Sequence, residues 1–431
     1  MVSAAEVIGQ PVSGRAVLAN RPFLIYLVTA IISSAGSFMQ SISVPFVLRD
    51  ITDSNTWIGI GTMAWMVPSL VVGPVSGIVS DRFDRRLVLI WSNVVQLVGA
   101  AGLFVIGLTD ALRPWPIVGL VTIGGLGAGF QYTAAQSIAA VILPPEHLLH
   151  GVRLNAMGFT VARAVGPAVA GLVLGFWGPT AAFGINAATY LVFIAALCVI
   201  RTRVVPLASG DTDWWRRFVE GARYVSRRPA LRLVVITAFI GAFFGQSMMQ
   251  LAAGLAKDGF HVGGAALGAL VAVYGTGSTV ASVALVRGGD RLPRSRMATI
   301  GLSLFGIGLT LAIGTPWYPV GLVGFLVAGT AHGFTNISLN TSVQAQVHEE
   351  FRGRALSLFL MALLAGMPFG ALAGGALGDV IGLRITLGIF AVTVTAYLTF
   401  VVTRRDRLAI LDGDEPIELD EAPALAPKIA G

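Results

Sequence analysis

Long apolar segments, separated by short polar ones, follow each other along almost the whole chain. Each segment has about the 20 residues that a helix needs to cross the hydrocarbon core of a bilayer. The segments are continuously apolar and do not alternate every second residue, which favours helices over a membrane barrel. The pattern predicts twelve transmembrane helices, at about residues 22–48, 57–79, 88–108, 115–141, 154–176, 180–200, 233–255, 265–286, 297–314, 317–345, 355–378 and 383–403.

Composition agrees with an integral membrane protein. Hydrophobic residues make up 55% of the 431-residue chain and charged residues only 12%, against about 25% charged residues in soluble domains. The formal net charge of +7 comes mainly from Arg residues that flank apolar segments. It therefore indicates basic loops at a membrane surface and no nucleic-acid partner.

The positions of Lys and Arg predict the orientation of the chain. Twelve spans place both termini on one side, and 24 of the 29 Lys and Arg residues fall on that side. Four fall on the opposite side, and Arg163 lies within a span. Because basic loops stay in the cytoplasm, we expect a multi-pass protein of the inner (plasma) membrane with both termini cytoplasmic.

The longest internal polar segment divides the chain into two sets of six spans. Within it, Trp214, Trp215, Phe218, Ala222 and Val225 can share one stripe of an amphipathic helix on the inner membrane surface; a plain tether is the alternative. The acidic end of the chain is expected to be disordered. The predicted domains are a cytoplasmic tail (1–20), an N-terminal six-helix bundle (21–200), a cytoplasmic linker (201–232), a C-terminal six-helix bundle (233–403) and a cytoplasmic acidic tail (404–431).

The two halves look like copies of each other. Four pairs of short motifs recur in the same order with an offset of roughly 204–209 residues, as is characteristic of transporters. The pairs are Gln40-Ser41 with Gln246-Ser247, Asp81-Arg82-x-x-Arg85 with Asp290-Arg291-x-x-Arg294, Gly129-Phe130-Gln131 with Gly333-Phe334-Thr335, and Gly166 and Gly171 with Gly370 and Gly375.

A polar turn between spans 2 and 3 carries the most specific motif. It reads Gly77-Ile-Val-Ser-Asp81-Arg82-Phe-Asp-Arg85-Arg86. This pattern resembles the signature loop of the major facilitator superfamily of transporters, although Asp84 stands where that family usually has Gly. The resemblance covers about residues 20–405. It implies an all-α membrane fold, with twelve helices in two pseudo-symmetric six-helix bundles.

Asp81 is the centre of a predicted gate. A carboxylate at the end of a span can accept hydrogen bonds from Arg or from a helix N-terminus, so it can latch one conformation and release in another. Positive-inside anchoring alone is the alternative for Arg85 and Arg86. The partial second copy gives three further gate candidates, Asp290, Arg291 and Arg294, with Val286 in place of the leading Gly.

Span 5 contains a second motif, Arg163-Ala-Val-Gly166-Pro167-Ala-Val-Ala-Gly171. Glycines spaced along one helix face allow close helix packing, and Pro167 removes one backbone hydrogen bond. The stretch resembles the Gly-Pro motif of drug antiporters, where it is associated with export; generic tight packing is the alternative. Arg352-Gly353-Arg354 before span 11 resembles the entry common in bacterial macrolide and siderophore exporters, the enterobactin type included.

Polar residues inside the spans are the candidate substrate contacts. The resemblance implies that spans 1, 4, 7 and 10 line the central cavity. Helix packing is the alternative for each amide. His332 is the proton-coupling candidate, or else a neutral hydrogen-bonding group. The predicted cavity residues are Gln40, Gln131, Gln136, Gln246, His332, Asn336 and Asn340.

No Asp or Glu lies in the middle of any predicted span. Related exporters often have an acid directly after the glycine of span 1, but here Ser37 follows Gly36. This departure argues against cationic substrates and weakens the case for proton antiport. A neutral or anionic amphipathic substrate fits better, with Arg163 and His332 as polar partners.

The sequence therefore predicts a secondary transporter that exports an amphipathic small molecule, such as a drug, siderophore or metabolite, by alternating access. Proton coupling is expected from the resemblance. A lipid or lysolipid transporter and a non-transporting receptor are the alternatives. No H-E-x-x-H, G-x-S-x-G or paired intramembrane carboxylates occur, so no enzyme, cofactor or metal is expected. The expected partners are the substrate, protons and membrane lipids, for a monomer.

Overall fold

The computed structural model describes residues 17–200, 214–288, 292–347, 349–403 and 410–412. Within these ranges the chain forms helices and turns, and no strand. Twelve of the described helical segments are long and apolar enough to cross a membrane. The structure confirms the expected all-α fold with twelve spans.

The N-terminal half consists of six long helices. Capping side chains fix two of their starts: the Asn20 Oδ1 accepts from the backbone N–H of Phe23 at 3.1 Å, and Asp84 accepts from that of Arg86 at 2.8 Å. The helices are α2 (Arg21–Thr52), α3 (Asn55–Arg82), α4 (Arg85–Leu108), α5 (Pro114–Ser137), α7 (Leu148–Phe176) and α8 (Gly178–Val199), with α6 (Ala139–Ile142) and η2 (Pro145–His147) between α5 and α7.

The C-terminal half has one irregular span and five continuous ones. The irregular span contains two π-helical segments, a feature that is frequent at functional sites. It consists of α10 (Pro229–Ile240), η3 (Gly241–Gln246), α11 (Ser247–Gln250), α12 (Ala252–Gly254) and η4 (Leu255–Gly259). The continuous spans are α13 (Gly264–Gly288), α14 (Arg294–Ile313), α15 (Tyr318–Gln346), α16 (Glu349–Ile381) and α17 (Leu383–Thr403).

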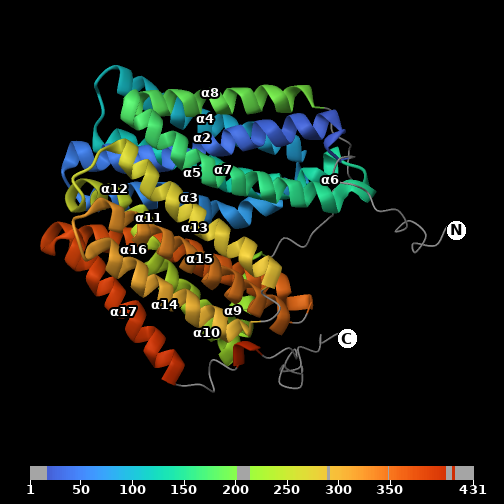
Figure 1. Cartoon of the computed structure of the whole chain (residues 1–431). Helices are drawn as coiled ribbons and strands as arrows, with labels where there is room; N and C mark the ends of the chain where they lie inside the picture. Colours follow the sequence, from blue (N-terminus) through green and yellow to red (C-terminus); the bar gives the residue numbers. More distant parts are fainter. Residues whose placement is uncertain (1–16, 201–213, 289–291, 348, 404–409, 413–431) are drawn as a thin grey trace.

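The two halves meet at one end of the molecule and diverge toward the other (Figure 1). We call the end where α2 begins and α17 finishes the terminal end, and the opposite end the distal end. Helix α3 packs on α16, and α7 packs on α13. In the second pair two glycines meet: a Cβ added to Gly171 would lie 2.6 Å from the Cα of Gly268. Only residues without side chains allow so close an approach.

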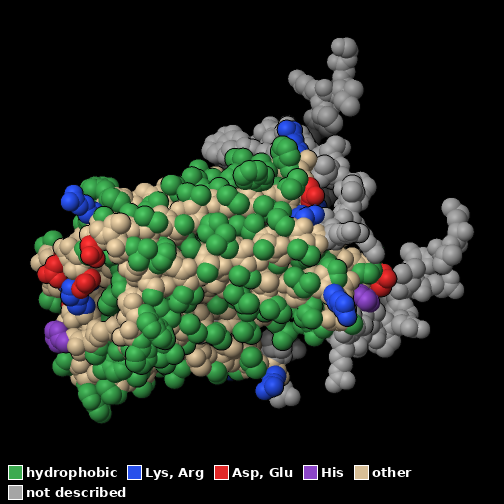
Figure 2. All heavy atoms as spheres, turned by 90° about the horizontal axis from the view of Figure 1, so that it is seen from above, with side chains coloured by type: hydrophobic (Ala, Val, Ile, Leu, Met, Phe, Trp, Pro, Cys, Tyr) green, Lys and Arg blue, Asp and Glu red, His purple; other side chains and the backbone are tan. Residues whose placement is uncertain are grey.

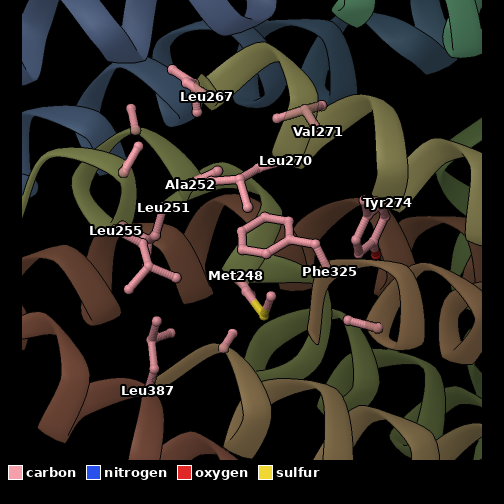
Figure 3. Packing of buried hydrophobic residues seen from close by; sticks show 14 of the residues in the cluster. Met248, Leu251, Ala252, Leu255, Leu267, Leu270, Val271, Tyr274, Phe325 and Leu387 are labelled. Atoms are coloured by element: carbon pink, nitrogen blue, oxygen red, sulfur yellow. The ribbon is translucent and has the colours of Figure 1, made fainter. Parts of the chain in front are cut away.

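A large apolar cluster fills the space between the seventh span and its neighbours. Figure 3 shows Met248 and Leu251 of that span beside Phe325 of α15 and Leu387 of α17. All four side chains are at most 2% exposed. This packing holds the irregular span in place although its helical hydrogen bonding is interrupted.

Charged side chains on the face shown in Figure 2 gather at the two ends, with a broad hydrophobic band between them. Large apolar side chains such as Trp91 and Val392 are more than half exposed. An apolar surface of this extent is costly in water and is suited to contact with lipid.

At the terminal end, α9 (Trp214–Arg227) packs against α16. Arg354 donates to Glu220 at 3.0 Å, and the ring of Tyr224 stacks on that of Phe351. Leu411, from η6 (Ile410–Asp412), is buried in the same cluster as Val225. Disorder was expected for the whole tail from residue 404, and the structure differs at these three residues. The remainder of the tail, like residues 1–16 and 201–213, lies outside the described residues.

Candidate functional site

A cavity of about 1470 Å³ lies between the two halves. Its walls come from α2, α3, α5 and α7 on one side, and from the irregular span, α13, α15 and α16 on the other. Six of the seven predicted cavity residues line it, namely Gln40, Gln131, Gln136, Gln246, His332 and Asn336. Asn340 is not among the lining residues and accepts a hydrogen bond from Gln344, one turn further along α15.

One contact crosses the cavity between the halves. Arg163 Nη2 of α7 lies 3.4 Å from His332 Nε2 of α15, and His332 Nδ1 lies 3.3 Å from the hydroxyl of Tyr274 in α13. Because a guanidinium has no acceptor, Nε2 must accept and Nδ1 must carry the hydrogen. The geometry therefore assigns a neutral imidazole between Arg163 and Tyr274. Tyr274 was not predicted, because a buried Tyr in an apolar span gives no polar pattern.

The cavity is basic. Among the described residues of its lining, Arg163 and Arg354 are the Lys or Arg residues, and none is Asp or Glu. Arg354 is paired with Glu220. No carboxylate in the described part of the chain pairs with Arg163, whose side chain lines the cavity.

Gln246 stands at the end of the π-helical segment η3 and lines the cavity. Its side chain is 2% exposed, and no described residue hydrogen-bonds to its Oε1. Buried polar atoms without partners are rare in folded proteins. Hydropathy patterns do not signal π-helical turns, so the sequence gives no sign that this span is irregular.

In the N-terminal half, two of the predicted cavity amides, Gln40 and Gln131, belong to hydrogen-bonded networks. Asn186 donates to Gln40 Oε1 at 2.6 Å. Gln96 donates to Gln131 Oε1 and accepts from Tyr190 at 3.1 Å. These bonds fix the side chains of Gln40 and Gln131 at the cavity wall. The two residues therefore both line the cavity and connect neighbouring helices, as the two alternatives from the sequence would have it.

Ser37, the residue that replaces the acid of related exporters, lines the cavity as well. Its hydroxyl lies 2.9 Å from that of Tyr190. Ser37 is thereby joined through Tyr190 to the Gln96–Gln131 pair. The network has no carboxylate, so it supplies no acidic proton carrier at this position.

The span-5 motif is a packing element with contacts on two sides. A Cβ on Gly166 would lie 2.8 Å from the backbone oxygen of Ala35 in α2, within the same half. Gly171 meets Gly268 of the other half. Pro167 lies within α7, in the turn between these glycines. The motif therefore sets the distance from α7 to both α2 and α13, and it carries Arg163 one turn before Gly166.

The signature loop joins α3 to α4 at the terminal end. Arg86 donates to the carbonyl oxygens of Leu197 and Cys198 at 2.6 and 2.7 Å, which ties the loop to the last turn of α8. Arg82 is exposed, and Arg85 begins α4. A Cβ on Gly77 would have no described atom within 4 Å, so no helix packs closely on that glycine here. The side chain of Asp81 lies outside what the structure describes, and its latch role stays a prediction.

The second copy of the loop is described only in part. Asp290 and Arg291 lie outside the described residues. Arg294 begins α14, and its Nη2 donates to the backbone oxygen of Asp412 at 2.9 Å. The carboxylate of Asp412 accepts from the backbone N–H of Ser295 at 2.9 Å, so a tail residue caps α14 where Pro293 has no side chain that could.

A polar network at the distal end joins the halves, and it was not predicted. Arg49 of α2 bonds both Asp53 and Asp258, and Lys257 lies 3.2 Å from Asp50. In the sequence, each of these acidic and basic residues stands at the end of a predicted span. Only the tertiary structure shows which of them are in contact.

Asp379 of α16 makes a second connection at this end. Its carboxylate accepts from the backbone N–H groups of Asn55 and Thr56, at 2.6 and 3.0 Å. These are the first residues of α3, in the opposite half. Asp379 therefore supplies an N-cap between the halves, at a helix end that its own Ser54 leaves without a side-chain cap.

Comparison with known proteins identifies the family. The family of transmembrane secretion effectors matches residues 12–426. The chain belongs to this family of major facilitator superfamily transporters. The multidrug efflux pump Tap of Mycolicibacterium fortuitum is 25% identical over 387 residues, which cover 85% of this chain and 91% of Tap. Macrolide efflux protein A of Streptococcus pyogenes is 21% identical over 359 residues, covering 82% of this chain and 88% of that protein.

The fold is also that of solved transporters. A bacterial homolog of the human lysosomal transporter Spinster, in its inward-facing and unoccupied conformation, superposes with a TM-score of 0.75 and 16% identity, over 91% of this chain and 99% of that one. The family and its relatives confirm the predicted resemblance. The protein is a multi-pass membrane transporter with efflux-type relatives, and not an enzyme.

Proposed function

We propose that the protein exports amphipathic small molecules across the plasma membrane by alternating access, with its terminal end in the cytoplasm. The charge distribution supports this orientation, since basic residues dominate the loops of that end. The names of its relatives, a macrolide efflux protein and a multidrug efflux pump, support export.

The cavity supports alternating access. Residues near the terminal ends of their helices line it, among them Tyr26 of α2, Asn155 of α7 and Ser357 of α16. At the distal end the halves are instead joined by Arg49, Asp258 and Asp379. In the proposed orientation, this arrangement corresponds to a state that is open to the cytoplasm and closed to the outside. Export then requires the distal contacts to break and the terminal ends to close, with Asp81 as the proposed latch.

Proton coupling is part of the proposal, with His332 as the carrier. Its neutral form accepts from Arg163, whereas an imidazolium would be repelled by the guanidinium. Protonation of His332 would therefore release a contact between the halves.

Flux measurements in proteoliposomes test the proposal. The purified chain is reconstituted and challenged with a panel of macrolides, siderophores, dyes and lysolipids, with and without an imposed pH gradient. We expect gradient-dependent movement of at least one amphipathic solute, which His332→Gln abolishes. Asn340→Ala is the matched control, because this amide lies on the same helix outside the cavity lining. Flux that ignores both the gradient and His332→Gln contradicts proton coupling. Flux of lysolipids alone favours the lipid alternative.

A further inference from the structure

We propose that the cavity recognises amphipathic molecules through an anionic group, which docks on Arg163 in competition with His332. This assignment rests on the proposed export function and adds the chemical class of the substrate. The charge balance of the cavity, the contacts of Arg163 and the composition of the surrounding wall carry it.

Arg163 differs from the other inward-placed cations of the chain. Arg49 has the carboxylates of Asp53 and Asp258, and Arg354 has that of Glu220. Arg163 has one polar contact among the described residues, a 3.4 Å approach to a neutral imidazole. A guanidinium that loses water on folding and gains no anion is costly. Because Arg163 lines the cavity, an anion from outside the chain can reach it and supply the missing partner.

An anionic ligand can reach Arg163 through the cavity, and no described acidic side chain of the lining competes with it. Arg163 is half-buried and lines the cavity. None of the lining residues that the structure describes is an Asp or Glu that could pair with Arg163 or repel an anionic ligand. The planar guanidinium presents paired N–H donors, which match the two oxygens of a carboxylate, sulfonate or phosphate.

The rest of the wall fits an apolar body attached to that anionic group. Phe159 lies one turn before Arg163 on α7, and its ring packs at 5.5 Å from that of Phe38 in α2. Met249 and Met361 line the cavity from the other half, and Met side chains adapt to varied apolar shapes. A ligand with a charged end at Arg163 and an apolar body along these side chains uses both features.

Anion binding at this point also affects the contact between the halves. Donors that turn to a ligand anion leave His332, so the cross-cavity contact weakens when the site is filled. The ligand therefore binds differently to the arrangement with the Arg163–His332 contact and to the arrangement without it. Such a difference in binding is what shifts a conformational equilibrium.

Binding of a matched pair of probes tests the proposal. The full chain in lipid nanodiscs is titrated at pH 8 with dansylaminoundecanoic acid and, separately, with its primary amide, and the signal of empty nanodiscs is subtracted. The probes share their apolar body and differ in charge. We expect the acid to bind about tenfold more tightly than the amide, a ratio typical of a gained charge-assisted pair. Arg163→Gln should reduce this ratio to about one while amide binding persists.

Two further variants separate recognition from folding. Arg354→Gln, the other cavity arginine, removes a charge already paired with Glu220, and the acid preference should survive it. Arg163→Lys keeps the charge but lacks the paired N–H donors of the guanidinium. It should give a ratio of acid to amide affinity between those of the wild type and Arg163→Gln. Elution profile and melting temperature report whether each variant is folded. If Arg163→Gln is misfolded, the wild-type ratio and the Arg163→Lys ratio decide.

Equal binding of acid and amide by the wild type overturns the anion site, as does an acid preference that persists in folded Arg163→Gln. Failure of the proposed function is recognised separately. In that case the nanodisc preference for the acid is present, but proteoliposomes move neither the probes nor any solute of the panel. Export of neutral solutes in proteoliposomes, together with equal binding of acid and amide in nanodiscs, supports the export function and contradicts only the anion site.

Discussion

The guanidinium of Arg49 donates two hydrogen bonds to the carboxylate of Asp258, from Nε to Oδ2 at 3.3 Å and from Nη2 to Oδ1. This pair joins the N-terminal half to the C-terminal half at the distal end. The Arg49 side chain is 8% exposed. A buried charge of this kind makes the contact strong when formed and costly when one partner is removed.

Replacing Asp258 with Asn should therefore open the distal end. The lost charge-assisted bonds are worth about 2 kcal/mol, enough to shift the closed state by more than tenfold. A cysteine placed at the cavity residue Ala253, in a Cys198→Ser background, should become reactive toward an impermeant maleimide in intact cells. Asp110→Asn is the control, because this distal acid makes no bond to the other half among the described residues. Equal labelling of both variants would contradict a gate role for Asp258.

The cap that Asp379 provides predicts a graded series. Asn also caps helices well, whereas Ala does not. The two backbone N–H groups donate to different oxygens of Asp379, and Asn keeps only one acceptor oxygen. Asp379→Asn should therefore raise the labelling at Ala253 less than Asp379→Ala, which should cost about 1 kcal/mol of distal closure. The ordering of the two variants is the test. If Asn and Ala behave alike, the charge of Asp379 matters and its capping geometry does not.

The glycine contact between α7 and α13 predicts different effects at two glycines. Gly171→Ala forces a methyl group against Gly268, and overpacking of this kind costs about 1–3 kcal/mol. Its melting temperature should fall. Gly77→Ala meets no described atom, so the thermal stability of this state should not change. If the signature loop closes during transport, Gly77→Ala should still slow export in the proteoliposome assay, and normal flux would contradict close packing at Gly77 in the other state.

The distal end should respond to acid in a defined direction. The hydrogen bond from Arg49 holds the pKa of the Asp53 carboxyl below its ordinary value. A carboxyl whose pKa is lowered in the folded state stabilises that state above its unfolded pKa, about 3.9, and the stabilisation is lost as pH falls through the folded value. The contribution of this pair to the melting temperature should be constant between about pH 8 and pH 5, and should be lost below about pH 4. Asp53→Asn should therefore make the fall of the melting temperature below about pH 4 smaller than in the wild type.

The sequence predicted the twelve spans, the two halves and most of the cavity, because those features follow from apolar length and from amides placed on particular spans. His332, Asn336 and Asn340 share a stripe of α15, yet the cavity ends before Asn340, and hydropathy carries no information on where helices diverge. The pairing of Arg49 with Asp258 and of Asp379 with α3 depends on contacts between residues more than 200 positions apart. The polar role of Tyr274 depends in the same way on which helix faces it.

The docked tail gives a final prediction. Leu411 is 2% exposed and Asp412 caps α14, so Asp412→Ala should lower the free energy of unfolding by about 1 kcal/mol. The melting temperature of the C-terminal half reports it. Asp420→Ala, further along the acidic tail, is the matched control, and an equal fall in both would contradict a specific cap.

The same cap bears on the order in which the chain is made. Helix α14 begins at Arg294, but the carboxylate that completes its first turn is translated 118 residues later than that arginine, after three further spans. During synthesis the start of α14 therefore stays uncapped until Asp412 has left the ribosome. A product that stops within α17 keeps most of its spans and lacks this closing contact. In such a chain the first backbone N–H groups of α14 have no side-chain cap at the membrane surface.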